Sequence, residues 1–237
     1  MGSVIVASEL EGRLKGRVQA ARRSVLTEDV YERVKSLIMN GDLEPGARVN
    51  IYAVARLLDV SQTPVREVLA ALESEGLLTK EALRGYSVAS VLTPDQVADL
   101  YQLRLLLEPW AAARAAERVT PDGAARLRAE LGSLPQAPQG TRYEDYHDIA
   151  AHDARFHDLV AELSGSPALR DSLQRTHGHL HLFRIEYEGR SSGEPTLAEH
   201  ARICAGVTSG LPEEAEQAMR DHLTAARERF LRIGPSQ

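Results

Sequence analysis

The stretch SQTPVREVLAALESEGLL, residues 61–78, decides the fold of the first part of the chain. Its apolar residues recur every three or four positions, which is the spacing of a helix that buries one side. These residues are Val65, Val68, Leu69 and Leu72. The first turn instead gathers four polar residues, namely Ser61, Gln62, Thr63 and Arg66. Such a polar tip either caps the helix within solvated surface or reaches for a partner.

The neighbouring segments predict a small module around this helix, for which Thr63 and Pro64 are expected to be the N-cap and the first residue. The other expected elements are a helix over 27–41, a turn over 43–49, a short helix over 51–58, and strands at 77–79 and 86–88 that form a hairpin. Three helices followed by a hairpin predict a winged helix-turn-helix domain over residues 25–92. Residues 1–24 are predicted to be a flexible tail.

The second part of the chain begins at Thr93-Pro94-Asp95-Gln96, a capping box with proline at the first helical position. No strand pattern follows it. Helices are predicted near 94–118, 121–131, 142–164, 167–187, 195–208 and 212–232. The expected fold is therefore mainly α, with an N-terminal winged helix-turn-helix that has a small β-hairpin wing, and an all-helical bundle over 93–237.

Charge and composition narrow the classes of protein that fit. The chain has 237 residues and a net charge of −6, and residues 93–237 hold 16 basic and 22 acidic residues, which accounts for all of it. The first domain is thus neutral as a whole and can still carry a basic patch. No apolar run approaches the roughly 20 residues that span a membrane. The single cysteine, Cys204, excludes an internal disulfide and predicts a cytoplasmic protein.

The polar tip of the helix over 61–78 carries side chains that can contact DNA bases and phosphates. In a helix-turn-helix, the second helix of the motif enters the major groove and its N-terminal residues contact bases and phosphates. Arginine can pair with guanine and glutamine with adenine, as Arg66 and Gln62 would. The alternative is that Ser61 and Thr63 only cap the helix and Arg66 is solvated. Residue spacing alone leaves both open.

The residues from Val30 to Val88, which read VYERVKSLIMNGDLEPGARVNIYAVARLLDVSQTPVREVLAALESEGLLTKEALRGYSV, resemble the winged helix-turn-helix of the GntR superfamily of bacterial regulators. The resemblance implies a dimer that binds a palindromic operator on double-stranded DNA, usually as a repressor. It carries over the DNA contacts Thr63, Arg66, Arg84 and Gly85, and it places Ser61 and Gln62 at the same tip. The family usually has arginine where this chain has Gln62, so the operator sequence is left open.

The second part resembles the FCD-type ligand domain of the FadR branch of that superfamily. The segments that carry this resemblance are LRLLLEPWAAARAA at 103–116, DARFHDLVAELSGSPAL at 153–169, EHARIC at 199–204 and AMRDHL at 218–223. Asp153 and His157 are four residues apart and share a helix face, but His200 and His222 lie on later helices. Spacing alone favours polar packing. The resemblance implies instead that these four residues bind a divalent metal ion, namely zinc, nickel, manganese or iron.

Arg104 lies in the first of these segments, and the resemblance implies that its side chain faces the effector cavity. It could bind the carboxylate of a small organic acid effector in bidentate fashion, or it could form an ion pair with Glu108 four residues on. His147 and His152 are expected at the surface. Apolar surface for a homodimer is expected on the helix over 94–118, from Leu103, Leu106, Leu107 and Trp110.

Three functions of different classes fit these observations. The first is a ligand-responsive transcription regulator whose effector binds beside the metal. The second is a metalloenzyme that uses the same histidine and aspartate residues, but no HExxH or nucleophile motif occurs and a DNA-binding domain would be unexplained. The third is an effector-independent DNA binder with a structural metal. We expect the regulator, and no enzyme activity.

Overall fold

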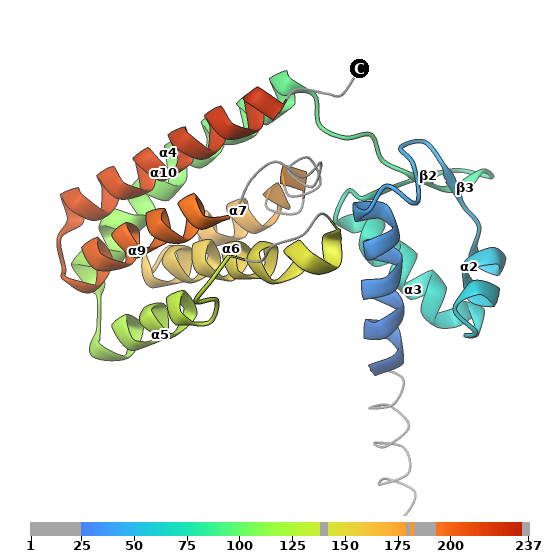
Figure 1. Cartoon of the computed structure of the whole chain (residues 1–237), viewed down its shortest axis with the longest axis horizontal. Helices are drawn as coiled ribbons and strands as arrows, with labels where there is room; N and C mark the ends of the chain where they lie inside the picture. The colour runs from blue at the N-terminus through green and yellow to red at the C-terminus, as the bar shows by residue number, and fades with distance from the viewer. Residues whose placement is uncertain (1–24, 138–141, 179–180, 183–192, 234–237) are drawn as a thin grey trace, which may run out of the picture. The chain divides into compact units, whose positions relative to one another are not determined.

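The structure is a computed structural model that describes residues 25–137, 142–178, 181–182 and 193–233 (Figure 1). The predicted flexible tail, residues 1–24, lies outside the described part of the chain. Contacts within the chain separate two compact units, and the division falls between Ser90 and Val91.

The first unit combines helices with a small antiparallel sheet, whose strands lie in the order β1-β3-β2. Its elements are a helix over 25–39, β1 (Arg48–Val49), α2 (Ile51–Leu57), α3 (Gln62–Ser74), β2 (Leu78–Glu81) and β3 (Gly85–Val88). The predicted winged helix-turn-helix with its hairpin is confirmed. Strand β1 lies in the segment that was predicted to be a turn, and Arg48 pairs there with Ser87 of β3.

Helix α3 buries the side that its sequence predicts. Val65, Val68, Leu69 and Leu72 are each at most 1% exposed. The prediction of its start was wrong by two residues, because Ser61 is the N-cap and the helix begins at Gln62. Pro64 therefore lies in the first turn, where the backbone N–H groups have no partner within the helix and a missing one is tolerated.

Among the residues described, the regular elements of the second unit are all helices. Its helices are α4 (Pro94–Arg118), α5 (Pro121–Gly132), α6 (Tyr143–Leu163), α7 (Pro167–Gln174), α9 (Glu194–Thr208) and α10 (Pro212–Ile233). The capping box at Thr93 is confirmed, with its hydroxyl accepting from the Gln96 backbone N–H at 3.3 Å. The helix predicted over 167–187 is shorter, because α7 ends at Gln174 and His177 has a left-handed backbone with φ 45°.

The long helices pack side by side around an apolar core (Figure 1). Helix α10 lies along α4 and α9, α6 packs on α4, and α5 packs on α6 and α9. The large buried residues Tyr101, Phe156, Ile203 and Leu223 belong to this core. Charged and polar side chains are buried beside it, on the faces of α4, α6, α9 and α10. No helix in the described part of the chain is long and apolar enough to cross a membrane.

Candidate metal centre and DNA-binding face

The structure brings together four side chains that the sequence singles out. Asp153 and His157 come from α6, His200 from α9 and His222 from α10, and all four are buried. Each offers one ligand atom, and these atoms all lie within 4.8 Å of one another. Three helices that are far apart in sequence therefore present one carboxylate and three imidazoles to a single point.

The atoms at this point are close enough to share one ion. Nε2 of His157 lies 3.2 Å from Nε2 of His222, and Oδ1 of Asp153 lies 3.3 Å from Nε2 of His200. Nε2 of His200 is also buried without a hydrogen-bond partner among the described residues. An unsatisfied buried polar atom is costly. The arrangement therefore fits a cation that accepts lone pairs from all four side chains.

The outer nitrogens of two of these imidazoles are held by carboxylates. Nδ1 of His157 contacts Glu108, and Nδ1 of His222 donates to Oε2 of Glu199 at 2.8 Å. A carboxylate at Nδ1 places the ring proton there and leaves the Nε2 lone pair directed inward. A hydrogen bond of this kind is the usual support of a metal-binding histidine.

The charge states of the site favour metal binding. Burial lowers the pKa of His157 to about 3, and it also lowers the pKa of His222, so both rings stay neutral. Although burial opposes ionisation of Glu108, Arg104 and His157 hold the pKa of that carboxyl well below its usual range. A neutral imidazole is the form that binds a metal ion, and an ionised carboxylate at Nδ1 of His157 accepts a hydrogen bond from that ring.

Arg104 lies at the edge of this centre and is 4% exposed. Its Nε donates to Oε1 of Glu108 at 2.6 Å, so the ion pair four residues apart is formed. Its Nη2 also lies 3.5 Å from Nε2 of His157. Together with Asp153 and His222, Arg104 lines a small cavity of about 20 Å³. Arg104 thus adjoins both Glu108 and the predicted metal ligands.

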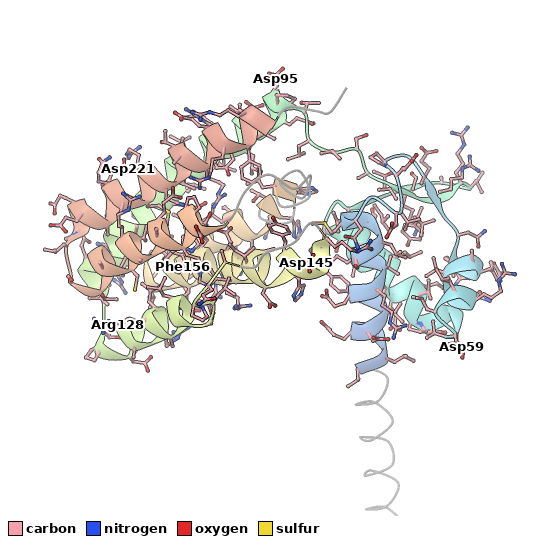
Figure 2. All side chains as sticks on the ribbon, in the orientation of Figure 1. Asp59, Asp95, Arg128, Asp145, Phe156 and Asp221 are labelled. Atoms are coloured by element: carbon pink, nitrogen blue, oxygen red, sulfur yellow. The ribbon has the colours of Figure 1, made fainter. Side chains whose placement is uncertain are left out.

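Aromatic stacking fixes one of the imidazoles. The ring of Phe156, which Figure 2 labels on α6, stacks on the ring of His200 with 4.1 Å between centroids and 7° between planes. Phe156 is itself fully buried. Because the stacked ring cannot tilt freely, the plane of His200 is set by packing as well as by hydrogen bonds.

The predicted DNA contacts occupy two exposed places in the first unit. At the start of α3, Ser61, Thr63 and Arg66 are exposed, and Nη2 of Arg66 lies 3.5 Å from Oε1 of Gln62. Ser61 makes no side-chain capping bond. In the wing, Nη1 of Arg84 lies 3.2 Å from Oε2 of Glu81. The structure therefore leaves the tip of α3 accessible to a partner.

The wing turn contains two residues with a left-handed backbone. Gly85 has φ 84°, which glycine adopts without strain, and it has open space where a side chain would project. Leu83 has φ 66° and is fully exposed. A leucine in this conformation is strained. The wing therefore presents an exposed apolar side chain next to Arg84.

Two family descriptions match the sequence and cover both units. Residues 26–88 match "Bacterial regulatory proteins, gntR family", and residues 99–225 match "FCD domain". The chain belongs to the GntR family of bacterial transcriptional regulators. The family and the relatives that match this GntR regulator are regulators of transcription and not enzymes, so the metalloenzyme alternative is set aside.

Relatives and solved structures agree with this assignment. The Nta operon transcriptional regulator of Aminobacter aminovorans is 44% identical over 190 residues, 80% of this chain and 87% of that protein. The uncharacterized regulator YdhC of Bacillus subtilis is 31% identical over 194 residues, 81% and 85% of the two chains. The structure of E. coli McbR/YncC, 24% identical, has a TM-score of 0.67 over 87% of this chain and 97% of that one, which shows a shared fold. Two further relatives are named as transcriptional repressors.

In this GntR regulator, sequence reasoning missed the residues that surround the candidate ligands. His152 was expected at the surface and is fully buried, and Glu199 had no assigned role. The helical periodicity does indicate that His152 is buried, because it recurs with Ile149, Phe156 and Val160 at the spacing of a buried helix face. Glu199 lies next to His200 in the sequence, but its contact with His222 depends on how α9 packs against α10.

Proposed function

We propose that this GntR regulator binds a palindromic operator as a homodimer, acts as a repressor, and responds to a small organic acid. The acid would bind beside a divalent metal held by Asp153, His157, His200 and His222. The observation that carries the proposal is the convergence of these four buried side chains on one point, with Nε2 of His200 left without a hydrogen bond among the described residues. The DNA contacts proposed are Ser61, Gln62, Thr63, Arg66, Arg84 and Gly85.

The ligand set restricts the metal and its role. Three imidazoles and one carboxylate suit zinc, nickel, manganese or iron. A tetrahedral zinc would be closed by four protein ligands and would be structural. An octahedral ion would keep two positions for an organic acid or water. When bound, an octahedral ion would supply a positive anchor for a carboxylate, and the protein side chains would orient the rest of the effector.

The charges around the site support an anionic effector. The buried carboxylates of Asp153, Glu108 and Glu199 exceed by one charge the guanidiniums of Arg104 and Arg229 that adjoin them. A divalent cation therefore leaves the centre with one positive charge, which an organic anion can balance. Arg104 is the proposed second anchor, because its guanidinium is buried and lies 3.5 Å from Nε2 of His157.

The small cavity suggests how binding could change the protein. As bounded by the described residues, it holds about 20 Å³, roughly the space of one water molecule. An organic acid that entered this cavity would have to displace lining side chains such as Arg104 or Arg229. An effector that binds one arrangement of the domain better than another shifts the equilibrium between them, which is the requirement for allosteric control of DNA binding.

A homodimer is proposed from the surface of α4 and from the size of the DNA-binding unit. Leu103, Leu106 and Trp110 are 37%, 66% and 48% exposed, and their spacing puts them on one side of the helix. A single helix-turn-helix unit reads only a half-site, so two copies are needed for a palindromic operator. A second copy of this chain would cover the apolar side of α4.

One experiment tests the proposed metal binding, operator binding and effector response together. Purified protein is analysed for metal content, an operator is selected from random DNA, and its affinity is measured with and without metal and a panel of small carboxylic acids. We expect bound metal, a palindromic site, and one acid that changes the DNA affinity only in the metal-loaded protein. Uptake of no divalent metal, or acids that act equally without metal, would overturn the proposed effector site.

The alternative of a structural metal has one observation in its favour, which is that four protein ligands are enough to close a tetrahedral site. It predicts that metal raises the melting temperature and that no organic acid raises it further. A thermal-shift screen of acids on the metal-loaded protein separates the two functions, because a ligand of the folded state stabilises it by mass action.

A further inference from the structure

The third imidazole of the centre, His200, is supported differently from the other two. Its Nδ1 lies 3.1 Å from Nε2 of another histidine, His152, instead of a carboxylate. Nδ1 of His152 in turn lies 3.1 Å from Oε1 of Glu130 on α5. Glu130 also accepts from Nε of Arg155 at 3.1 Å and 3.2 Å. A chain of four side chains therefore runs from the centre to the surface of α5 and α6.

The residues that hold the other two imidazoles indicate what this row of hydrogen-bonded side chains does. Glu199 accepts from His222 and also from Nη1 and Nη2 of Arg229, each at 2.8 Å. Glu108 is held in the same way between His157 and Arg104. In each case a carboxylate fixed by arginine accepts a hydrogen bond from the outer ring nitrogen. Glu130 and Arg155 likewise form a carboxylate–arginine pair, but His152 lies between this pair and the ring of His200.

Metal binding would allow only one arrangement of protons along the hydrogen-bonded row from His200 through His152 to Glu130. Nε2 of His200 must offer its lone pair to the ion, so Nδ1 of His200 carries the proton and donates to Nε2 of His152. His152 then carries its own proton on Nδ1 and donates a hydrogen bond to the carboxyl oxygen Oε1 of Glu130. His152 must therefore accept at one ring nitrogen and donate at the other at the same time. An apolar residue of the same volume can do neither.

We propose that His152, with Glu130 behind it, is a positioning residue of the metal centre that holds His200 in the tautomer able to bind the ion. This inference rests on the proposed metal site. The competing explanation is packing, because His152 is fully buried and its ring centroid lies 6.0 Å from that of Phe156. The two explanations differ in what a replacement must retain: hydrogen bonding at both ends in the first, and volume alone in the second.

The test uses the full chain, stripped of metal and then titrated with zinc and separately with nickel against a chromophoric chelator. His152→Leu removes both hydrogen bonds at similar volume, and we expect roughly 10-fold to 100-fold weaker metal binding, as for the loss of other outer partners of metal ligands. His152→Gln keeps an acceptor and a donor at the end of the side chain and should restore most of the affinity. The matched control is His147→Leu on the same helix, where the His147 side chain is 42% exposed and contacts Asp148 and Tyr143.

Each outcome has a defined reading. Equal affinities in wild type and His152→Leu, or a His152→Gln protein as weak as His152→Leu, overturn the inference and leave packing as the role of His152. Wild type that binds neither metal overturns the metal site itself and the inference with it. If His152→Leu does not fold, Glu130→Ala provides the test. The Glu130 side chain lies nearer the surface, 14% exposed, and its loss should weaken metal binding at the lower end of the range for outer partners, roughly 10-fold. Unchanged affinity in Glu130→Ala would then overturn the proposal.

Discussion

The two units of this regulator prepare their candidate sites in opposite ways. In the helical unit, the four predicted ligands are buried, and the outer nitrogen of every imidazole already has a partner. In the winged unit, the predicted DNA contacts are exposed except for Gln62, which is half-buried. Among the described residues, Arg66 contacts the nearby Gln62 and Arg84 contacts the nearby Glu81. The side chains of the candidate metal centre are therefore held in place before a metal binds, whereas those of the DNA-binding face would become ordered on binding DNA.

The difference follows from what each ligand supplies. A metal ion is a single point, so its ligands must be held in place by the rest of the fold, and burying them without the ion costs stability. DNA offers a long row of phosphates and base edges, and it replaces water around side chains that remain solvated until then. Exposed ion pairs contribute about 0–1 kcal/mol, so Arg84 can leave Glu81 with little loss. We therefore expect metal to change stability and DNA-face mutations to change affinity.

The largest effect is expected when two ligands are removed together. His200→Ala with His222→Ala should abolish metal uptake, and with it a stabilisation of about 4 kcal/mol at a free metal concentration 1,000 times the dissociation constant. Thermal melts with and without zinc or nickel, beside elemental analysis, measure this. His147→Ala is the control and should melt as wild type does in both conditions. If wild type takes up no metal and melts like the double mutant, the four residues are polar packing.

A pH dependence of the metal-free helical unit should follow from its buried imidazoles. Burial lowers the pKa of His157 to about 3, whereas an unfolded histidine titrates near 6.5. Between these values the unfolded chain binds the proton and the folded one does not, so stability present above pH 6.5 is lost as the pH falls toward 3. The slope is about 1.4 kcal/mol per pH unit for each imidazole that stays neutral. Denaturant melts at pH 7.5, 6.5 and 5.5 check it, and stability that rises on acidification would contradict it.

How far the sequence predicted these sites depends on whether their signals are local. The helices of the second unit were predicted to within a few residues where they begin at capped turns, as α4 does at Thr93. Helical spacing placed Asp153 and His157 on one face, but only the resemblance to the FCD domain predicted that these two residues, with His200 and His222, are metal ligands. Local signals of this kind remain readable without knowledge of which elements pack together.

The rest depends on contacts between distant segments. Strand β1 has two residues and exists only because Arg48 and Val49 pair with β3, so the turn signal around Pro45-Gly46 concealed it. The role of Glu199 requires the packing of α9 on α10, and that of Glu130 requires the packing of α5 on α6. No spacing within one segment contains that information.

The DNA face should show the opposite behaviour to the metal centre. Arg66→Ala is expected to weaken operator binding by about 1–3 kcal/mol if Arg66 pairs with a guanine or a phosphate, while thermal stability changes little because Arg66 is exposed. Gel-shift titrations at fixed salt measure the affinity. Arg33→Ala removes the same charge from an exposed residue of the same unit and is the control. Equal affinities of Arg66→Ala and Arg33→Ala would remove Arg66 from the contacts.

The smallest effect is expected at the wing, where folding and DNA binding make different demands on one residue. Leu83 is fully exposed and has φ 66°, a conformation that asparagine and glycine tolerate better than leucine. Leu83→Asn should therefore raise the free energy of unfolding by about 0.5–1 kcal/mol, which denaturant melts can resolve. The control is Leu57→Asn, at another exposed leucine but within α2, which should gain nothing. If Leu83→Asn is less stable than wild type, the wing turn is not strained in solution. If it is more stable but binds the operator less well, the leucine was kept for DNA contact at the expense of folding, as expected for a site that its ligand organises.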